Sequence, residues 1–233
     1  MSNLSILSEK VGVEFKNESF IEHAFVHRSY LNESKKFSES NERLEFLGDS
    51  ILSFLTSTFL YRKFPDEPEG QLTNLRSSIV KTTTLFHVAT VLSLGDYLLL
   101  SKGEEDGGGR KNQSILADTF EAFLGAVYLD SGIRAAEKIL VTYLFPLIDR
   151  VLKEKLYKDS KSSFQELVQE NSRVSPLYRV LKEIGPDHAK EFSVGVYVEN
   201  TLWGEGSGKS KQDAEQNAAL SALEKWEKKK YTT

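Results

Sequence analysis

NERLEFLGDS, residues 41–50, is the most informative stretch of the sequence because it combines a helical repeat with three acidic side chains. At the rotation of about 100° per residue in an α-helix, Glu42, Glu45 and Asp49 fall within an arc of about 60°. Apolar residues occupy the opposite side, namely Leu44, Leu47, Ile51, Phe54 and Leu55. The stretch therefore predicts a helix with one buried apolar face and one face of three carboxylates.

Three carboxylates on one helix face repel one another. Like charges three or four residues apart destabilise an isolated helix by about a few tenths of a kcal/mol per pair. No lysine or arginine shares the acidic arc, and Arg43 lies about 100° away from Glu42. We therefore expect a cation from elsewhere to balance this face.

A second predicted helix, residues 116–130 (LADTFEAFLGAVYLD), carries a matching acidic pair. Asp118 and Glu121 are three residues apart and share one face. Gly125 lies on the same side, where it is expected to leave room for a ligand. The other face is apolar, with Phe120, Phe123 and Val127.

Two such helices can bring four or five carboxylates together. Oxygen-only, hard ligands suit Mg²⁺ or Mn²⁺ rather than zinc, and clusters of this kind support phosphodiester hydrolysis. The alternative is that the acids only line solvated helix faces, and spacing alone favours the two interpretations about equally. Calcium is disfavoured because the sequence has no EF-hand loop pattern.

The composition of the 233 residues, 39% apolar and 27% charged, is typical of a soluble protein of one or two domains. The absence of cysteine excludes disulfides and thiolate metal sites. The start, MSNLSILSEKVGVEF, has neither a basic beginning nor a long apolar run. We therefore expect no signal peptide, no membrane anchor and a cytoplasmic location.

A net charge of −4 is unusual for a protein that binds nucleic acid, but the charge is unevenly distributed. From Lys158 to the end there are 12 basic and 12 acidic residues, which leaves 18 basic and 22 acidic residues before it. The whole acidic excess therefore lies in the first two-thirds of the chain, and the tail must be interpreted from where its charges stand.

The apolar spacing predicts an all-α domain over residues 1–152, a linker over 153–160 and a second domain over 161–229. Breaks are expected at residues 64–70 (FPDEPEG) and 103–109 (GEEDGGG). The second of these is rich in glycine and polar residues, so we expect it to be mobile.

The second domain has the order helix, three strands, helix, in an α-β-β-β-α fold of the α+β class. Asp213 stands at the capping-box position of its last helix. The expected elements are a helix at 163–171, strands at 177–184, 192–198 and 201–206, and a helix at 210–226.

Double-stranded RNA offers 2′-hydroxyls in a shallow minor groove and phosphates across the major groove. A protein that binds it needs polar groups and cations along one face. Each candidate taken alone is unremarkable, because a lysine pair at a helix start is usually only solvated and a single loop histidine is usually structural or incidental. The candidates are Gln165 and Glu166 on the first helix, His188 in the loop between the first two strands, and Lys209 and Lys211 at the start of the last helix.

These motifs, in this order, resemble bacterial ribonuclease III over nearly the whole chain. The stretch at 41–50 is highly similar to the nuclease motif of that family. Shorter similar stretches are His27-Arg28-Ser29-Tyr30, Pro68-Glu69-Gly70 followed by Leu72-Thr73, Ser114-Ile115-Leu116-Ala117-Asp118, GPDHAKEF (185–192) and GKSKQDAEQNAA (208–219).

The resemblance assigns roles that spacing does not establish. Glu42 and Glu69 match supporting acids that line the same catalytic cleft. Phe46, about 40° from Glu42 on the helix, matches an aromatic residue that inserts into a pocket of the other subunit. The metal-binding and catalytic acids are matched by Glu45, Asp49, Asp118 and Glu121.

The resemblance also implies an activity. It predicts a homodimer that uses Mg²⁺, with Mn²⁺ as a substitute, to cut double-stranded RNA into products with 5′-phosphates and short 3′ overhangs. Family members process ribosomal RNA precursors and some messenger RNAs. Two alternatives are an RNA-binding protein whose helical domain only dimerises, and a phosphohydrolase of small nucleotides. The six acidic matches argue against the first, and the RNA-binding tail argues against the second.

Two positions depart from the family pattern. Gln212 follows Lys211 where two adjacent basic residues are common, so one phosphate contact is expected to be lost, with Lys209 as partial cover. Gln113 stands where glutamate is common. Neither position belongs to the acidic set, so we expect an active enzyme.

Overall fold

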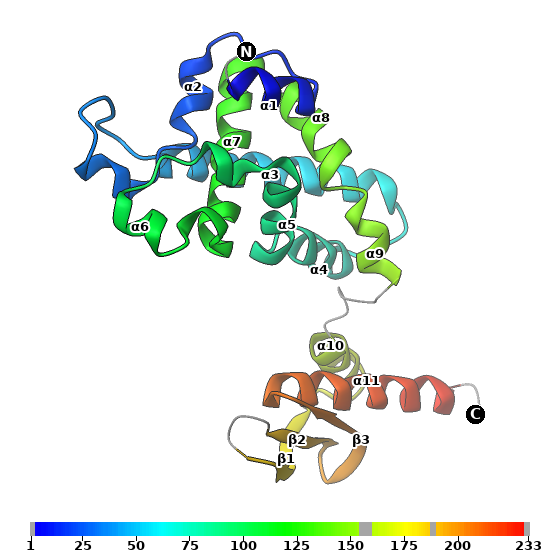
Figure 1. Ribbon diagram of the computed structural model, residues 1–233. Helices are drawn as coiled ribbons and strands as arrows, with labels where there is room; N and C mark the ends of the chain where they lie inside the picture. Colours follow the sequence, from blue (N-terminus) through cyan, green and yellow to red (C-terminus); the bar gives the residue numbers. More distant parts are fainter. Residues whose placement is uncertain (1–2, 154–159, 187–189, 231–233) are drawn as a thin grey trace. The chain divides into compact units, whose positions relative to one another are not determined.

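Figure 1 shows the computed structural model, which describes residues 3–153, 160–186 and 190–230. The chain forms two compact units, residues 1–157 (the helical unit) and residues 158–233 (the sheet unit). The helical unit is built from α-helices, and the sheet unit has the order α-β-β-β-α, so the predicted fold class is confirmed. Of the predicted linker, residues 154–159 lie outside the described residues.

The helical unit is made of α-helices joined by short turns and 3₁₀ segments. Within the described residues, none of its helices combines the length and apolar character that a bilayer span requires. Its helices are α1 (Asn3–Val11), α2 (Glu18–His23), α3 (Glu42–Lys63), α4 (Glu69–Ile79), α5 (Thr82–Leu92), α6 (Lys102–Asp106), α7 (Gln113–Ser131), α8 (Ile133–Tyr143) and α9 (Leu147–Lys153), with 3₁₀ segments η1 (Arg28–Asn32), η2 (Leu94–Tyr97) and η3 (Gly109–Lys111).

Helix α7 is the centre of the helical unit, and α3 crosses it in direct backbone contact (Figure 1). A Cβ atom added at Gly48 would overlap the carbonyl oxygen of Glu121, and one at Gly125 would overlap that of Leu44. The prediction that Gly125 leaves room for a ligand is therefore wrong. The missing side chain instead lets two helix backbones touch.

The start of α3 is fixed by the segment that precedes it. The backbone N–H of Asn41 donates to the carbonyl of Val26 at 2.8 Å, and its Nδ2 donates to the carbonyl of Ala24 at 3.0 Å. Asn41 is itself buried, so these bonds satisfy polar groups that water cannot reach. They set where the acidic face of α3 begins.

The apolar face predicted for α3 is only partly buried. Leu44, Ile51 and Leu55 lie in the core, and Leu47 packs against it. Phe54 is 61% exposed, so its predicted burial is wrong. It lies about 120° from Glu42 on the helix, at the edge of the apolar face, and the described residues leave that edge largely open to solvent.

The expected mobile break at residues 103–109 is also wrong in part. Residues 102–106 form α6, because Ser101 Oγ accepts a hydrogen bond from the backbone N–H of Glu104 and caps the helix. Arg110 then holds the segment, through a 2.7 Å ion pair with Glu105 and a hydrogen bond to the carbonyl of Leu98. Glycine content alone did not reveal these bonds.

The sheet unit packs two helices against one face of an antiparallel sheet with strand order β1-β2-β3. The pairing of β1 with β2 shifts between Val180 and Lys182, and β1 is exposed along almost its whole length. The elements are α10 (Ser160–Ser172), β1 (Leu177–Ile184), β2 (Glu191–Val198), β3 (Thr201–Gly208) and α11 (Lys211–Lys230).

Helix α11 lies close against β3 because the strand presents glycines to it. Cβ atoms at Gly204 and Gly206 would overlap the α11 backbone near Ala218. Ser210 Oγ accepts a hydrogen bond from the backbone N–H of Asp213 at 3.1 Å, as an N-cap should. The strand and the cap together fix where the start of α11 lies.

The first prediction follows from the close crossing of α3 and α7. Gly48→Ala places a methyl group where the Glu121 carbonyl oxygen lies, so the helices must separate. We expect the free energy of unfolding in urea to fall by about 3 kcal/mol or more. The control is Gly103→Ala in α6, where a Cβ meets nothing within 4 Å and alanine is the better helix former. Equal stabilities for the two variants would contradict this account.

Candidate active site

The crossing of α3 and α7 brings acidic side chains of the two helices together. Carboxylate oxygens of Glu45, Asp118 and Glu121 all lie within 4.8 Å of one another, and we call these residues the carboxylate cluster. Asp49, one turn after Glu45, is close enough to raise the pKa of both Glu45 and Glu121. Four of the predicted acids therefore share one site.

Crowding and burial make this site unfavourable for negative charge. Burial raises the pKa of Glu121 to about 8, with further contributions from the charges of Asp49, Asp118 and Glu45. Burial also raises the pKa of Glu45 and that of Asp118. In the absence of a bound cation, the carboxyl group of Glu121 is therefore largely protonated at neutral pH.

The donor set fits a hard divalent cation. Mg²⁺ binds oxygen ligands at about 2.0–2.1 Å, so ligand oxygens around one ion stand roughly 3–4 Å apart. The oxygens of the carboxylate cluster need only small side-chain movements to reach that spacing. A divalent ion would also remove the repulsion that raises these pKa values.

Glu42 lies beside the carboxylate cluster and has partners of its own. It raises the pKa of Glu45 through its charge. Ser40 Oγ donates to the Glu42 carboxylate at 2.7 Å, and Arg28 Nη1 lies 3.8 Å from it. Arg28 thus supplies, at the edge of the acidic face, part of the positive charge that the sequence led us to expect.

His27 belongs to a motif that the sequence singled out without assigning it a role. Its Nδ1 accepts the backbone N–H of Ser29 and lies 2.8 Å from Ser29 Oγ, which itself accepts the backbone N–H of Ser101. When the ring carries a single proton on Nε2, Ser29 Oγ donates its proton to Nδ1. Burial raises the pKa of Asp118, and the positive charge of a protonated His27 lowers it.

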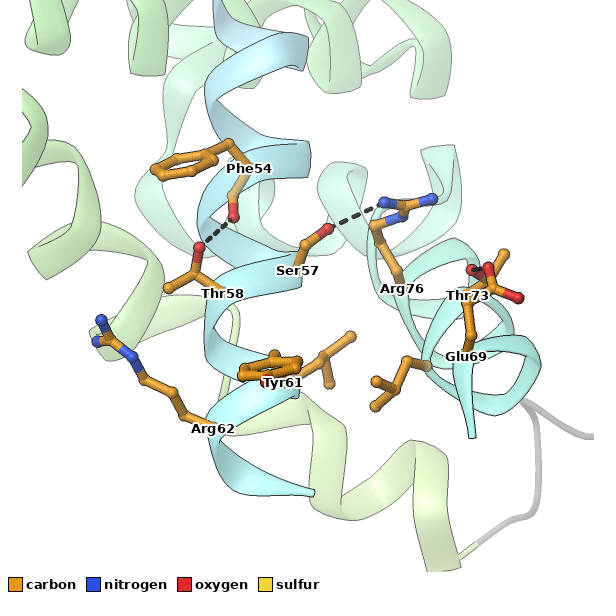
Figure 2. A pocket seen from close by; sticks show the side chains of 10 residues that line it. Phe54, Ser57, Thr58, Tyr61, Arg62, Glu69, Thr73 and Arg76 are labelled. Atoms are coloured by element: carbon orange, nitrogen blue, oxygen red, sulfur yellow. Dashed lines mark hydrogen bonds between the residues drawn. The ribbon is translucent and has the colours of Figure 1, made fainter. Parts of the chain in front are cut away.

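Glu69 lies at the other end of α3. It accepts a hydrogen bond from Thr73 and lines a pocket of about 640 Å³ between α3 and α4, with Phe54, Tyr61 and Arg76 (Figure 2). Arg76 donates to Ser57 across this pocket. The distance from Glu45 to Tyr61 along the helix is about 24 Å. Within one chain, then, Glu69 is not part of the acidic site.

Exposed aromatic side chains follow one side of α3. Phe46, Phe54 and Tyr61 are 77%, 61% and 74% exposed, and we call them the aromatic strip. They fall between about 40° and 120° from Glu42, between the acidic face and the core face. Large exposed apolar groups in a row are typical of surfaces that bind another protein or a ligand.

The predicted RNA-binding residues of the sheet unit are at the surface wherever they are described. Gln165 and Glu166 are exposed on α10, and Lys209 and Lys211 are exposed at the start of α11. Lys211 forms an ion pair with Glu183 of β1, which the sequence did not suggest. His188 lies outside the described residues.

The chain is similar to known proteins over both units. A family model described as Ribonuclease-III-like matches residues 17–148, and one described as Double-stranded RNA binding motif matches residues 160–226. Ribonuclease 3 of Pelotomaculum thermopropionicum is 46% identical over 95% of this chain and 92% of that protein. Ribonuclease 3 of Bacillus licheniformis is 48% identical over 94% of this chain and 88% of that protein.

A solved structure adds a similarity in three dimensions. The nuclease domain of ribonuclease III from Campylobacter jejuni matches with a TM-score of 0.58 and 37% identity. The match covers 62% of this chain and 99% of that one. The structure is described as showing flexibility in a region involved in dimer formation of that nuclease domain.

The raised pKa of Glu121 makes the second prediction. Its pKa is about 8 in the folded protein against 4.5 for the free side chain, so between these values the folded state binds more protons. The stability contributed by this proton is full below pH 4.5 and is lost as the pH rises through 8. Without metal, we expect a loss of roughly 1–3 kcal/mol after allowance for solvent screening.

Urea unfolding in a chelator at pH 5, 7 and 9 measures this loss. Glu121→Gln keeps the hydrogen-bonding shape but cannot ionise, so its stability should change less over this range. Glu9→Gln, which changes an exposed residue of α1, is the matched control and should follow the wild type. Parallel profiles for all three proteins would rule out an ionising Glu121 as the cause.

Proposed function

The chain belongs to the ribonuclease III family of double-stranded-RNA-specific endoribonucleases, and on this premise we propose that it cuts RNA duplexes at the carboxylate cluster with Mg²⁺ as cofactor. Glu45, Asp49, Asp118 and Glu121 hold the metal, and Mn²⁺ can replace it. The single observation that carries this assignment is the convergence of carboxylate oxygens from α3 and α7.

The residues of the site have distinct tasks in this proposal. A bound divalent ion lowers the pKa of a water molecule and stabilises the leaving oxygen. Glu45 and Asp118 fix the position of the ion from opposite helices. Asp49 and Glu121 act as the catalytic acids at its edge, and Glu42 supports them from the start of α3. Hydrolysis leaves a 5′-phosphate and a short 3′ overhang.

The sheet unit supplies recognition. Gln165 and Glu166 contact one minor groove, His188 the next, and Lys209 and Lys211 the phosphates between them, which together span about 16 base pairs. These contacts are to sugars and phosphates, so they select duplex RNA with little regard to sequence. The proposed domains are residues 1–152 for catalysis and 161–229 for RNA binding, joined by 153–160.

Two copies of the chain form the active enzyme in this proposal. The aromatic strip is the surface that the second copy covers, and Phe46 of one copy enters the pocket lined by Phe54 and Tyr61 in the other. In a two-fold interface each contact occurs twice. The two α3 helices then run antiparallel, with the Phe46 end of each beside the Tyr61 end of the other.

This arrangement accounts for Glu69. Within one chain it lies far from the carboxylate cluster, yet it matches an acid that lines the catalytic cleft. Antiparallel pairing of α3 carries Glu69 of the second copy to the Glu42 end of the first. One cleft thus receives acids from both subunits.

The cellular role follows from the same premise. We propose that the substrates are duplex segments of ribosomal RNA precursors and of some messenger RNAs. The proposed location is the cytoplasm, where these transcripts are made and processed in bacteria.

The third prediction tests the chemistry. A long RNA duplex incubated with the protein should be cut only when Mg²⁺ or Mn²⁺ is present, and mapped ends should carry 5′-phosphates and short 3′ overhangs. Glu121→Gln removes a charge that holds the metal, so we expect its cleavage rate to fall by at least about a hundredfold, while duplex binding in a chelator is retained. Near-normal turnover of this variant at saturating Mg²⁺ would refute the assignment.

The fourth prediction tests the assembly. Phe46→Ala removes a large apolar side chain from the proposed interface, so the dimer should weaken by about 2–4 kcal/mol. A sedimentation-velocity dilution series measures this. Val91→Ala on α5, which truncates a side chain that is 46% exposed, is the control and should leave the dimer unchanged. An undiminished dimer in the Phe46 variant would exclude this interface.

A further inference from the structure

Lys211 is held in place by two neighbours in the RNA-free protein. Its Nζ lies 3.1 Å from Glu183 Oε1, and the same Nζ lies 5.5 Å from the centre of the Phe192 ring. Glu183 is near the end of β1 and Phe192 is near the start of β2, so the contact joins α11 to the base of the loop between these strands.

Lys209, the other proposed phosphate ligand, differs from Lys211 in its surroundings. It is exposed, and within the described residues no ion pair to it is found. Of the two proposed phosphate ligands at this end of α11, Lys211 is therefore the one with a carboxylate partner among the described residues of the sheet unit. Both side chains of the pair are accessible to a ligand, with 58% of Lys211 and 41% of Glu183 exposed.

We propose that Glu183 limits the affinity of the sheet unit for duplex RNA by competing with an RNA phosphate for Lys211. This inference rests on the proposed role of Lys211 as a phosphate contact. A phosphate oxygen must approach Nζ to about 2.7–2.9 Å to form a charge-assisted hydrogen bond. It must either displace Glu183 or share Lys211 with it.

Both routes weaken binding. Displacement gives up the ion pair, and sharing leaves a carboxylate about 5 Å from a phosphate oxygen of the same sign. At the dielectric constant of water, repulsion at that distance corresponds to roughly a fourfold loss of affinity, and salt reduces it. Loss of the exposed ion pair itself corresponds to an affinity about one- to fivefold lower.

The pair also affects the dependence on salt. Each phosphate that a free lysine neutralises adds about 0.9 to the slope of log affinity against log salt. A lysine that already has a carboxylate partner releases fewer counterions. Glu183 therefore makes the interaction both weaker and less sensitive to salt than the number of basic residues suggests.

The fifth prediction is measured as duplex binding by the full chain, in a chelator to prevent cleavage, over a series of KCl concentrations. Glu183→Gln keeps the size and hydrogen bonding of the side chain but removes its charge. We expect about two- to fourfold tighter binding at low salt and a slope steeper by up to about one. Lys211→Gln should weaken binding and flatten the slope, and the double variant should bind like Lys211→Gln.

The matched control is Glu205→Gln, which makes the same change of charge elsewhere in the sheet unit. Gly204 and Gly206 face α11, so Glu205 between them lies on the opposite face of the sheet. Glu205→Gln should produce less than half of the gain in duplex affinity that Glu183→Gln produces. Thermal unfolding of every variant verifies that the sheet unit is folded.

The outcomes separate this inference from the proposed function. If Lys211→Gln binds like the wild type, Lys211 is not a phosphate contact and both proposals about it fail. If Lys211→Gln weakens binding while Glu183→Gln binds equally or less tightly, Glu183 positions Lys211 rather than competing for it, and only the inference fails. A gain that persists in the double variant would also overturn it, since net charge would then be the cause.

Discussion

The backbone contact between α3 and α7 is the constraint on which the rest of the helical unit depends. Gly48 and Gly125 remove the side chains that would hold these helices apart. Ordinary helix pairs stand 8–10 Å apart, and only small residues at the crossing allow a closer approach. At that separation the side chains that flank the crossing must meet, and on one side they are acidic. The same contact that completes the core therefore assembles the carboxylate cluster.

This assembly stores electrostatic strain in the site. Glu121 is half-buried among three other carboxylates, and burial and repulsion together raise its pKa to about 8. The packing of α7, most of whose apolar residues are buried, offsets this cost. A protein can keep such a site only where other interactions exceed its cost. What the site gains is a strong preference for any ligand that replaces protons with a divalent positive charge.

The sequence predicted those features that depend on the local periodicity of apolar and polar residues. The acidic arc at 41–50 and the strands of the sheet unit follow from helical and two-residue periodicity, and the fold class predicted from them is confirmed. Features set by contacts between distant segments were not accessible. Gly125 was misinterpreted because its partner lies on another helix, and Phe54 because the edge of an apolar face is buried only if something covers it. The orientation of His27 depends on Ser101, about seventy residues away, through a bond that no local pattern predicts.

The charged residues of the two units are arranged in opposite ways, and the arrangement in each unit matches the ligand that we propose for it. The helical unit leaves like charges together where α3 crosses α7, and among the described residues Arg28 pairs with the outer acid Glu42. A compact divalent ion can satisfy such a site because it fits among several oxygens. The sheet unit instead gives Lys211 a carboxylate neighbour at its surface. RNA presents phosphate charges along a long helix, so in the proposed mode of binding the affinity is a sum over many contacts that can be lowered at one of them without loss of the others. Concentrated charge thus suits the ion, and distributed, partly balanced charge suits a duplex that must be released after it is cut.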